Sequence, residues 1–536
     1  MTADVDLVGP DEVGQIPAAR SIRRYTTGAA NARSGAQLGT VLQDVYYAII
    51  TLAISVAIAL GLAQQLRVSL PPAPDVVAPR GLSLPTLVTV VIVGLVGVLL
   101  SLAGRLGPIG AGGAEATWWL GLPVDRRGLL RPAARRLPAL AALVGAVLVA
   151  LLDAGLLADS PARVVQVAVT SGLVAAAVVL LAGLAQSLGV ARRSTALAGD
   201  LVLVAAPFAA LGSALAAVHL ERVPTLAWPF VVVLGVGVAA LAVVVDRRLD
   251  RVPARTLRES GSVASQAVGA MVSLDSRELG RALSDGTARA TRRRLSRLRT
   301  ARGPASALVT TDLVVLRRST RHVVQLVVTA LIPVLVSTVP QLASTAGVLL
   351  SLLVAGYVAQ SATGEGARRA EMVPALDRLL PLEARTVRRL RMVVPAAVMA
   401  LWSLVVFAAV GRWAGDVAGW MALGLAATPV WAAAAVRSAY RASPDWGAPL
   451  VSTPMGALPS GVGSVIARGP DVVVLGLLPV WIALLVRTVT PVMLGAQITC
   501  ALIAVMVASS IHKGGLLERM MDASGEQAGR PTDTKR

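Results

Sequence analysis

Residues 83–104 read SLPTLVTVVIVGLVGVLLSLAG and contain no charged side chain. A helix needs about 20 mostly apolar residues to cross the hydrocarbon core of a bilayer, so this stretch predicts a transmembrane helix. Similar runs recur along the chain, which is 55% hydrophobic and has a mean hydropathy of +0.71, whereas soluble domains are about 45–50% apolar. The sequence therefore predicts an all-α polytopic membrane protein.

About twelve transmembrane helices are expected, six before and six after a long polar stretch. Their expected ranges are 45–64, 83–104, 137–157, 164–187, 199–219, 225–245, 322–342, 345–362, 392–411, 417–436, 471–486 and 491–511. The expected domains are a cytoplasmic N-terminal segment (1–44), a first six-span half (45–246), a cytoplasmic linker with an interfacial helix (247–321), a second six-span half (322–511) and a cytoplasmic tail (512–536).

Two polar segments have expected structures of their own. Within the linker, the helix-like sequence Ser284–Leu298 carries five arginines and suits the surface of an anionic membrane. The Pro- and Gly-rich segment Ser452–Gly463 is expected to be a cytoplasmic loop or, alternatively, a broken re-entrant helix shielded from lipid.

The basic residues predict the orientation of the chain. The net charge is +20, and all but Lys513 and Lys535 of the 50 basic residues are arginine. If both termini are cytoplasmic, only six of the 50 fall in outside loops, as the positive-inside rule requires. This distribution explains the basic charge without a nucleic-acid partner. The first 40 residues lack the apolar core of a cleavable signal peptide, and a multi-pass protein of the plasma membrane is expected.

The sequence offers little for catalysis or metal binding. Its single cysteine, Cys500, lies in an apolar run, and the histidines His219, His322 and His512 lie at the ends of three different expected spans. An intramembrane enzyme would need clustered carboxylates or histidines. We therefore expect no catalytic residue, no metal site and no cofactor in this chain.

The two halves resemble each other after the second span. The first half reads EATWWLGLPVDRRGLLRPAARRLPAL from Glu115 to Leu140, and the second reads EMVPALDRLLPLEARTVRRLRMVVPA from Glu371 to Ala396. The cores are LPVDRR (Leu122–Arg127) and LPLEAR (Leu380–Arg385), and each is followed by a further proline, Pro138 or Pro395. With six spans each, the halves are expected to be parallel repeats related by an axis along the membrane normal.

The physical expectation for the first copy is a short surface helix. Trp118 and Trp119 suit the membrane–water boundary, Pro123 permits a turn, and Asp125 lies near a helix start with arginines after it. Such a helix would direct acidic and basic side chains into the cytoplasm, where they would be able to dock a partner.

This segment resembles the coupling helix of permeases in type-2 ATP-binding-cassette (ABC) exporters, which fits into a cleft on the ATPase subunit. The resemblance covers the span order of both halves and about six residues of motif in each. It implies that the docking residues are Leu122, Pro123, Asp125, Arg126 and Arg127 in the first half, and Leu380, Pro381, Glu383 and Arg385 in the second. The second copy departs from the first, because Ala384 replaces an arginine and the two tryptophans are missing.

The resemblance implies a fused permease, as in some actinobacterial exporters. It would move an amphipathic or hydrophobic compound, antibiotic- or lipid-like, with two separate cytoplasmic P-loop ATPase subunits. The chain has no G-x-x-x-x-G-K-[ST] motif of its own, so ATP and Mg²⁺ would be bound by the partner. The resemblance leaves open whether two whole chains pair as a homodimer.

Two other functions fit parts of the sequence. A major-facilitator carrier also has six plus six spans, and Gly121, Asp125, Arg126 and Gly128 match its G-x-x-x-D-R-x-G pattern. In that family the pattern directly follows the second span, whereas here it begins about 16 residues after Arg105. The spans also have few of the intramembrane charges on which ion-coupled carriers rely. A membrane scaffold without transport activity is the other alternative.

Overall fold

The computed structural model describes residues 18–34, 38–69, 71, 81–157, 160–272, 280, 282–283, 301–373, 377, 379–440, 450–453, 456–459 and 469–510. Within these residues, ten helices are long and apolar enough to cross a membrane. The chain is therefore a multi-pass membrane protein built almost entirely of α-helices, as the sequence predicts. Two compact units divide it: residues 1–294 with 335–344, and residues 295–334 with 345–536.

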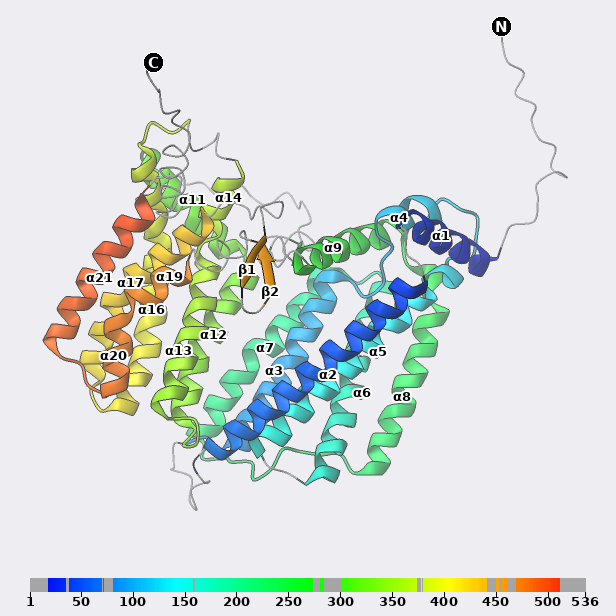
Figure 1. The fold of residues 1–536 in the computed structure, drawn as a ribbon, viewed down its shortest axis with the longest axis horizontal. Helices are drawn as coiled ribbons and strands as arrows, with labels where there is room; N and C mark the ends of the chain where they lie inside the picture. The colour runs from blue at the N-terminus through cyan, green and yellow to red at the C-terminus, as the bar shows by residue number, and fades with distance from the viewer. Residues whose placement is uncertain are drawn as a thin grey trace, which may run out of the picture. The chain divides into compact units, whose positions relative to one another are not determined.

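The first unit holds the helices in blue to green in Figure 1. They are α1 (Ala19–Ser34), α2 (Leu38–Ser69), α3 (Leu84–Leu106), α4 (Gly113–Trp119), α5 (Arg126–Leu152) with the π-helical turn η2 (Asp153–Leu157), α6 (Pro161–Ser187), α7 (Arg192–Leu215), α8 (Trp228–Arg247), the 3₁₀ turn η3 (Leu249–Arg251) and α9 (Ala254–Val272).

The second unit holds the later helices and one hairpin. They are α11 (Pro304–Arg318), α12 (Thr320–Thr338, of which the last residues belong to the first unit), α13 (Thr345–Thr363), α14 (Glu365–Met372), α16 (Ala384–Ala414), α17 (Val417–Ala439), β1 (Leu450–Thr453), β2 (Gly456–Pro459), α19 (Pro470–Gly476), α20 (Leu478–Val486) and α21 (Pro491–Ser509).

Each expected span range overlaps a helix, although the ranges 199–219, 225–245 and 322–342 extend three or four residues beyond theirs, and one range has an internal break. The range 471–486 is interrupted at Leu477, which separates α19 from α20. Pro479 gives the physical reason, because proline has no N–H to donate and its ring clashes with the carbonyl four residues before it. The expectation of one uninterrupted helix over 471–486 is therefore wrong.

Side chains replace the hydrogen bonds that the break removes. The indole N–H of Trp481 donates to the carbonyl of Val474 at 3.2 Å, and the amide of Gln497, on α21, donates to the carbonyl of Gly476 at 2.9 Å. A broken helix is tolerated at membrane depth only where neighbouring groups satisfy its backbone in this way.

Small residues bring neighbouring helices close together. A Cβ atom at Gly97 of α3 would lie 2.6 Å from the backbone nitrogen of Leu203 in α7, and one at Gly145 of α5 would lie 2.9 Å from the Cβ of Ala175 in α6. Both positions need glycine, because a larger side chain would push the helices apart. Figure 1 shows α3 running beside α7.

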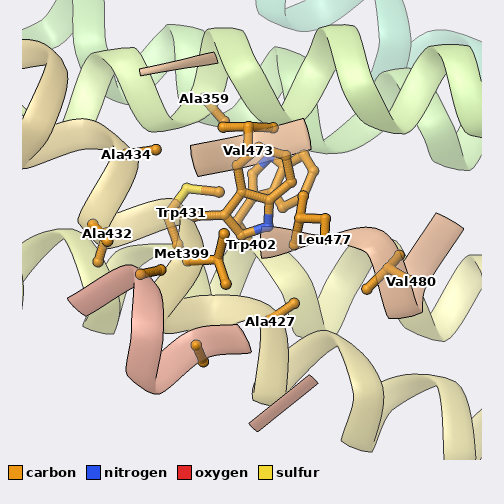
Figure 2. Close-up of a cluster of buried hydrophobic side chains, with 14 of the residues drawn as sticks. Ala359, Met399, Trp402, Ala427, Trp431, Ala432, Ala434, Val473, Leu477 and Val480 are labelled. Carbon is orange, nitrogen blue, oxygen red and sulfur yellow. The ribbon is translucent and has the colours of Figure 1, made fainter. Parts of the chain in front are cut away.

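The second unit has the larger apolar core, centred on two tryptophans (Figure 2). Trp402 of α16 and Trp431 of α17 meet edge to face, with ring centroids 6.2 Å apart. A Cβ at Gly356 of α13 would lie 2.5 Å from the Trp431 ring, so glycine leaves the space that the indole occupies. Val473 and Leu477 of the broken helix close the cluster.

The polar segments differ in part from expectation. The interfacial helix expected at Ser284–Leu298 and the cytoplasmic tail 512–536 lie outside the described residues. The described part of the linker contains α9 and α11. In the segment Ser452–Gly463, the described residues belong to the antiparallel hairpin β1–β2, with Leu450 opposite Pro459. A broken helix is therefore wrong for these residues, in which β-branched Val451 and Thr453 favour a strand.

Candidate functional site

The first candidate turn connects α4 to α5 at one end of the first unit. Leu120 is buried and anchors the turn, while Leu122 and Pro123 are exposed. The backbone N–H of Leu122 donates to the carbonyl of Trp119 at 3.3 Å, which closes the end of α4. The apolar Leu–Pro pair is thus presented on the surface of the unit, where a partner is able to reach it.

Asp125 is the N-cap of α5. Its Oδ1 atom accepts the backbone N–H of Arg127 at 2.9 Å, and its side chain is otherwise exposed. The expected short surface helix starting here is wrong, because α5 runs without interruption from Arg126 to Leu152 and continues through η2. The turn therefore leads directly into a membrane-spanning helix of 32 residues.

Arg127 makes contacts within the chain. Its guanidinium donates to Oδ2 of Asp246, at the end of α8, with distances of 2.5 Å from Nη2 and 3.1 Å from Nε. Arg131, one turn later, donates to both oxygens of Asp246, at 2.6 and 2.8 Å. Arg127 thus ties α5 to α8, while Arg126 beside it is half-buried.

The second candidate turn lies between α14 and α16 in the second unit. The N–H of Leu382 donates to the carbonyl of Leu380 at 2.8 Å, so a three-residue turn forms around Pro381. Leu380 is half-buried, whereas Pro381, Glu383 and Arg385 are exposed. Glu383 occupies the N-cap position of α16 without a side-chain capping bond. This turn also leads directly into a long membrane-spanning helix.

Behind the second turn lies a buried ion cluster. Arg391 of α16 donates to Asp312 of α11 at 2.9 Å and to Asp377, a residue between α14 and α16, at 2.7 Å. The hydroxyl of Tyr440 also donates to Asp377, at 3.4 Å. Burial raises the pKa of the Asp312 carboxyl, and the nearby charge of Arg391 opposes that change. The cluster fixes α11 and the segment before the turn to α16.

A related contact joins α16 to α21. Arg388 donates to the backbone carbonyl of Ser510, which caps α21, and its guanidinium lies 4.9 Å from the centroid of the Tyr440 ring. In both units, therefore, arginines in the first turns after a Leu–Pro turn bind the end of the unit's last membrane-spanning helix. The partner is a carboxylate in one unit and a carbonyl in the other.

A second buried ion pair lies in the first unit, between α3 and α7. Arg105 donates to Asp200 at 2.7 Å, and the hydroxyl of Ser101 donates to the other oxygen of Asp200 at 2.6 Å. Both charged side chains are more than nine-tenths buried. Within the part of the chain that the structure describes, no group of three or more His, Cys, Asp or Glu side chains is placed to hold a metal ion.

One family model matches residues 80–449, which is more than half of the chain, and its description is a family of unknown function, DUF6297. The chain belongs to the DUF6297 family. No curated protein and no solved structure matches it. The segment matched to DUF6297 begins just before α3 and ends after α17. It therefore contains both Leu–Pro turns and the ion pairs of Arg105, Arg127 and Arg391.

The structure brings the predicted residues of each turn together within its own unit, from Leu122 to Arg127 and from Leu380 to Arg385. Sequence reasoning missed Asp246, the acidic partner of Arg127, and the buried Arg391 with its partners Asp312 and Asp377. A signal existed for Asp246, which is the first charged residue after the uncharged run 225–245. Asp312 and Asp377 lie in polar segments that showed no pattern pointing to Arg391.

Proposed function

We propose that this protein is the membrane permease of an ATP-driven exporter, and that separate P-loop ATPase subunits dock on its two Leu–Pro turns. One observation carries the proposal: each unit presents a Leu–Pro turn whose proline is exposed, and this turn ends in an acidic residue and leads directly into a long membrane-spanning helix. A displacement of the turn by a partner would be transmitted along that helix, because α5 and α16 have no loop between the turn and the membrane.

Two parallel six-helix repeats would share a packing order, and part of that order is the same in the two units. In the first unit α5 packs against α6, and α6 against both α3 and α8; in the second, α16 packs against α17, and α17 against both α13 and α21. The matching helices have the same order in the sequence. Twelve spans result if α2, with 32 residues, and the pair α19–α20 cross the membrane in addition to the ten long apolar helices.

The lining of a cavity in the first unit favours an apolar or amphipathic compound as the transported substrate. A cavity of about 340 Å³ lies between α3, α5 and α6, and its lining is almost entirely aliphatic, with Thr89, Thr170 and Ser171 among its few polar residues. Binding pockets for small molecules are commonly apolar with a few polar groups. On this proposal both termini are cytoplasmic, the membrane is the plasma membrane, and one ATPase docks on each half.

The test is co-purification of the full-length tagged chain in mild detergent, with mass spectrometry and an ATPase assay. A P-loop ATPase at two copies per chain is expected. Asp125→Asn should weaken its association while leaving α5 intact, because asparagine caps a helix as well as aspartate does. Pro123→Ala and Glu383→Gln should also weaken it, whereas Arg193→Gln, an exposed arginine on α7, should not. Recovery of the chain alone, without ATPase activity, would overturn the proposal.

The buried Arg105–Asp200 pair favours a secondary carrier as the second candidate. Ionisable residues inside a membrane bundle are costly and often serve ion coupling, and this pair joins two spans at their closest approach. Uptake or efflux driven by a proton or sodium gradient in reconstituted vesicles, and lost in Asp200→Asn, would support the carrier. A scaffold would show neither transport activity.

A further inference from the structure

A cavity of about 370 Å³ opens between α5, α6 and α8 at the end of the first unit where α5 begins. Its walls on α5 and α8 are formed mainly by small apolar residues: Ala134, Pro138 and Ala142 of α5, and Gly235, Ala239 and Ala242 of α8. Gly235 makes no close helix contact, since the nearest atom to a Cβ placed there would be 3.9 Å away. The glycine therefore widens the cavity rather than tightening the packing of helices.

The mouth of this cavity is charged. Asp246 and Arg135 both line it. Arg127, Arg131 and Arg135 are spaced four residues apart on α5, so they share one face of the helix, and all three guanidiniums reach toward Asp246. The first two make hydrogen bonds of 2.5–3.1 Å, whereas Arg135 comes only to 4.0 Å and its side chain is 69% exposed.

The charges at the mouth do not balance. Asp246 supplies one negative charge to three arginines, which leaves a surplus of two positive charges. The residues that follow Asp246 add to the excess, because Arg247, Arg248 and Arg251 outnumber Asp250. The cavity thus combines an aliphatic interior with a cationic mouth at the boundary of a membrane-spanning bundle.

We propose that this cavity binds an anionic phospholipid of the adjacent leaflet, with its phosphate on Arg135 and Arg131 and an acyl chain between α5 and α8. Basic pockets between membrane helices recognise anionic head groups through the same combination of charge and apolar surface. A soluble anion would use the mouth alone and leave the apolar interior empty. The proposal needs no ATPase and rests only on the membrane setting of the chain.

The test uses the full-length chain in mild detergent, with the dissociation constant of added lipid measured by native mass spectrometry and its effect on thermal unfolding measured in parallel. Phosphatidylglycerol should bind and raise the midpoint of unfolding, phosphatidylcholine should bind about tenfold more weakly, and inorganic phosphate should have no effect. Arg135→Gln should weaken the binding of phosphatidylglycerol about tenfold, which is the loss expected for one charge-assisted hydrogen bond.

Arg136→Gln is the matched control, because Arg136 is the next residue, is also exposed and does not line the cavity. It should retain wild-type affinity. Gly235→Leu, which fills the apolar interior without changing the charge, should weaken the binding of both lipids. Equal losses in Arg135→Gln and Arg136→Gln, equal affinity for the two lipids, or full stabilisation by inorganic phosphate would each overturn the proposal.

Discussion

Arg391 holds two carboxylates that come from different parts of the second unit: Asp312 from α11 and Asp377 from the segment before α16. Its side chain is 9% exposed, and that of Asp312 is 7% exposed. Charges in such surroundings are tolerated only while they are paired, because removing one partner leaves the other desolvated and uncompensated. The arginine therefore stabilises the polar end of the unit on which the second Leu–Pro turn is mounted.

Arg391→Ala should lower the free energy of unfolding by about 3–5 kcal/mol, the usual cost of breaking a buried ion pair. Denaturant unfolding in detergent, followed by tryptophan fluorescence, measures it. Arg389→Ala is the control: the residue is exposed on the same helix, and its loss should change stability by less than about 0.5 kcal/mol. Equal stabilities of the two variants would mean that the ion cluster contributes nothing to the fold.

Glu365, at the start of α14, makes a pH-dependent contribution to the stability of the folded state. Burial acts to raise its pKa, but the nearby positive charges of Arg368 and Arg369 outweigh burial and hold the pKa below its ordinary value of 4.5. A carboxylate with a lowered pKa stabilises the folded state at pH values above the ordinary value, and that stability is lost as the pH falls through the folded-state pKa.

The midpoint of thermal unfolding should therefore be lower in Glu365→Gln than in the wild type at pH 7, and the gap should shrink as the pH falls below 4.5. Glu383→Gln, which alters an exposed glutamate without a capping bond, should show little gap at either pH. A gap for Glu365→Gln that stays constant from pH 7 to pH 3.5 would contradict the assigned direction of the pKa change.

At the scale of elements, the break between α19 and α20 depends on one proline and two compensating donors. Gln497→Leu should cost about 1–3 kcal/mol, because it leaves the carbonyl of Gly476 unsatisfied in a buried site. In a Pro479→Ala background the cost should be smaller, since alanine restores the backbone donor and lets the helix close. Unfolding of the four proteins in a double-mutant cycle measures the coupling. Additive costs would show that Gln497 does not compensate for the break.

The sequence predicts the membrane-spanning helices more accurately than it predicts the breaks within them. A long, mostly uncharged run is enough to predict a span, and each of the twelve expected ranges overlaps a helix. The range 471–486 is uncharged after Asp471, so its average hydropathy does not indicate the break before Pro479. Similarly, the sequence places Asp125 near a helix start, and Asp125 is the N-cap of α5, but nothing in the turn itself indicates that α5 continues into the membrane.

A single sequence does not predict which carboxylates pair with Arg391 and Arg127. Arg391 and Asp312 are separated by 79 positions, and Arg127 and Asp246 by 119. Basic residues near span ends indicate the orientation of the chain, and this explains their number but gives no partners. Only folding brings a given carboxylate to a given arginine, so Arg127 was predicted as a docking residue although its side chain binds α8.

At the scale of the whole molecule, the orientation of the chain and the symmetry of its repeats together predict which segments are accessible from outside the cell. In a Cys500→Ala background, single cysteines at the exposed positions Pro123, Ala384, Glu221 and Arg412 sample the two Leu–Pro segments and two loops expected outside. A membrane-impermeant maleimide on intact cells should label positions 221 and 412 only, and should reach 123 and 384 only after lysis. Parallel repeats require positions 123 and 384 to behave alike. If one of them is labelled in intact cells and the other is not, the halves are inverted, and ATPase subunits cannot dock on both turns from the same side.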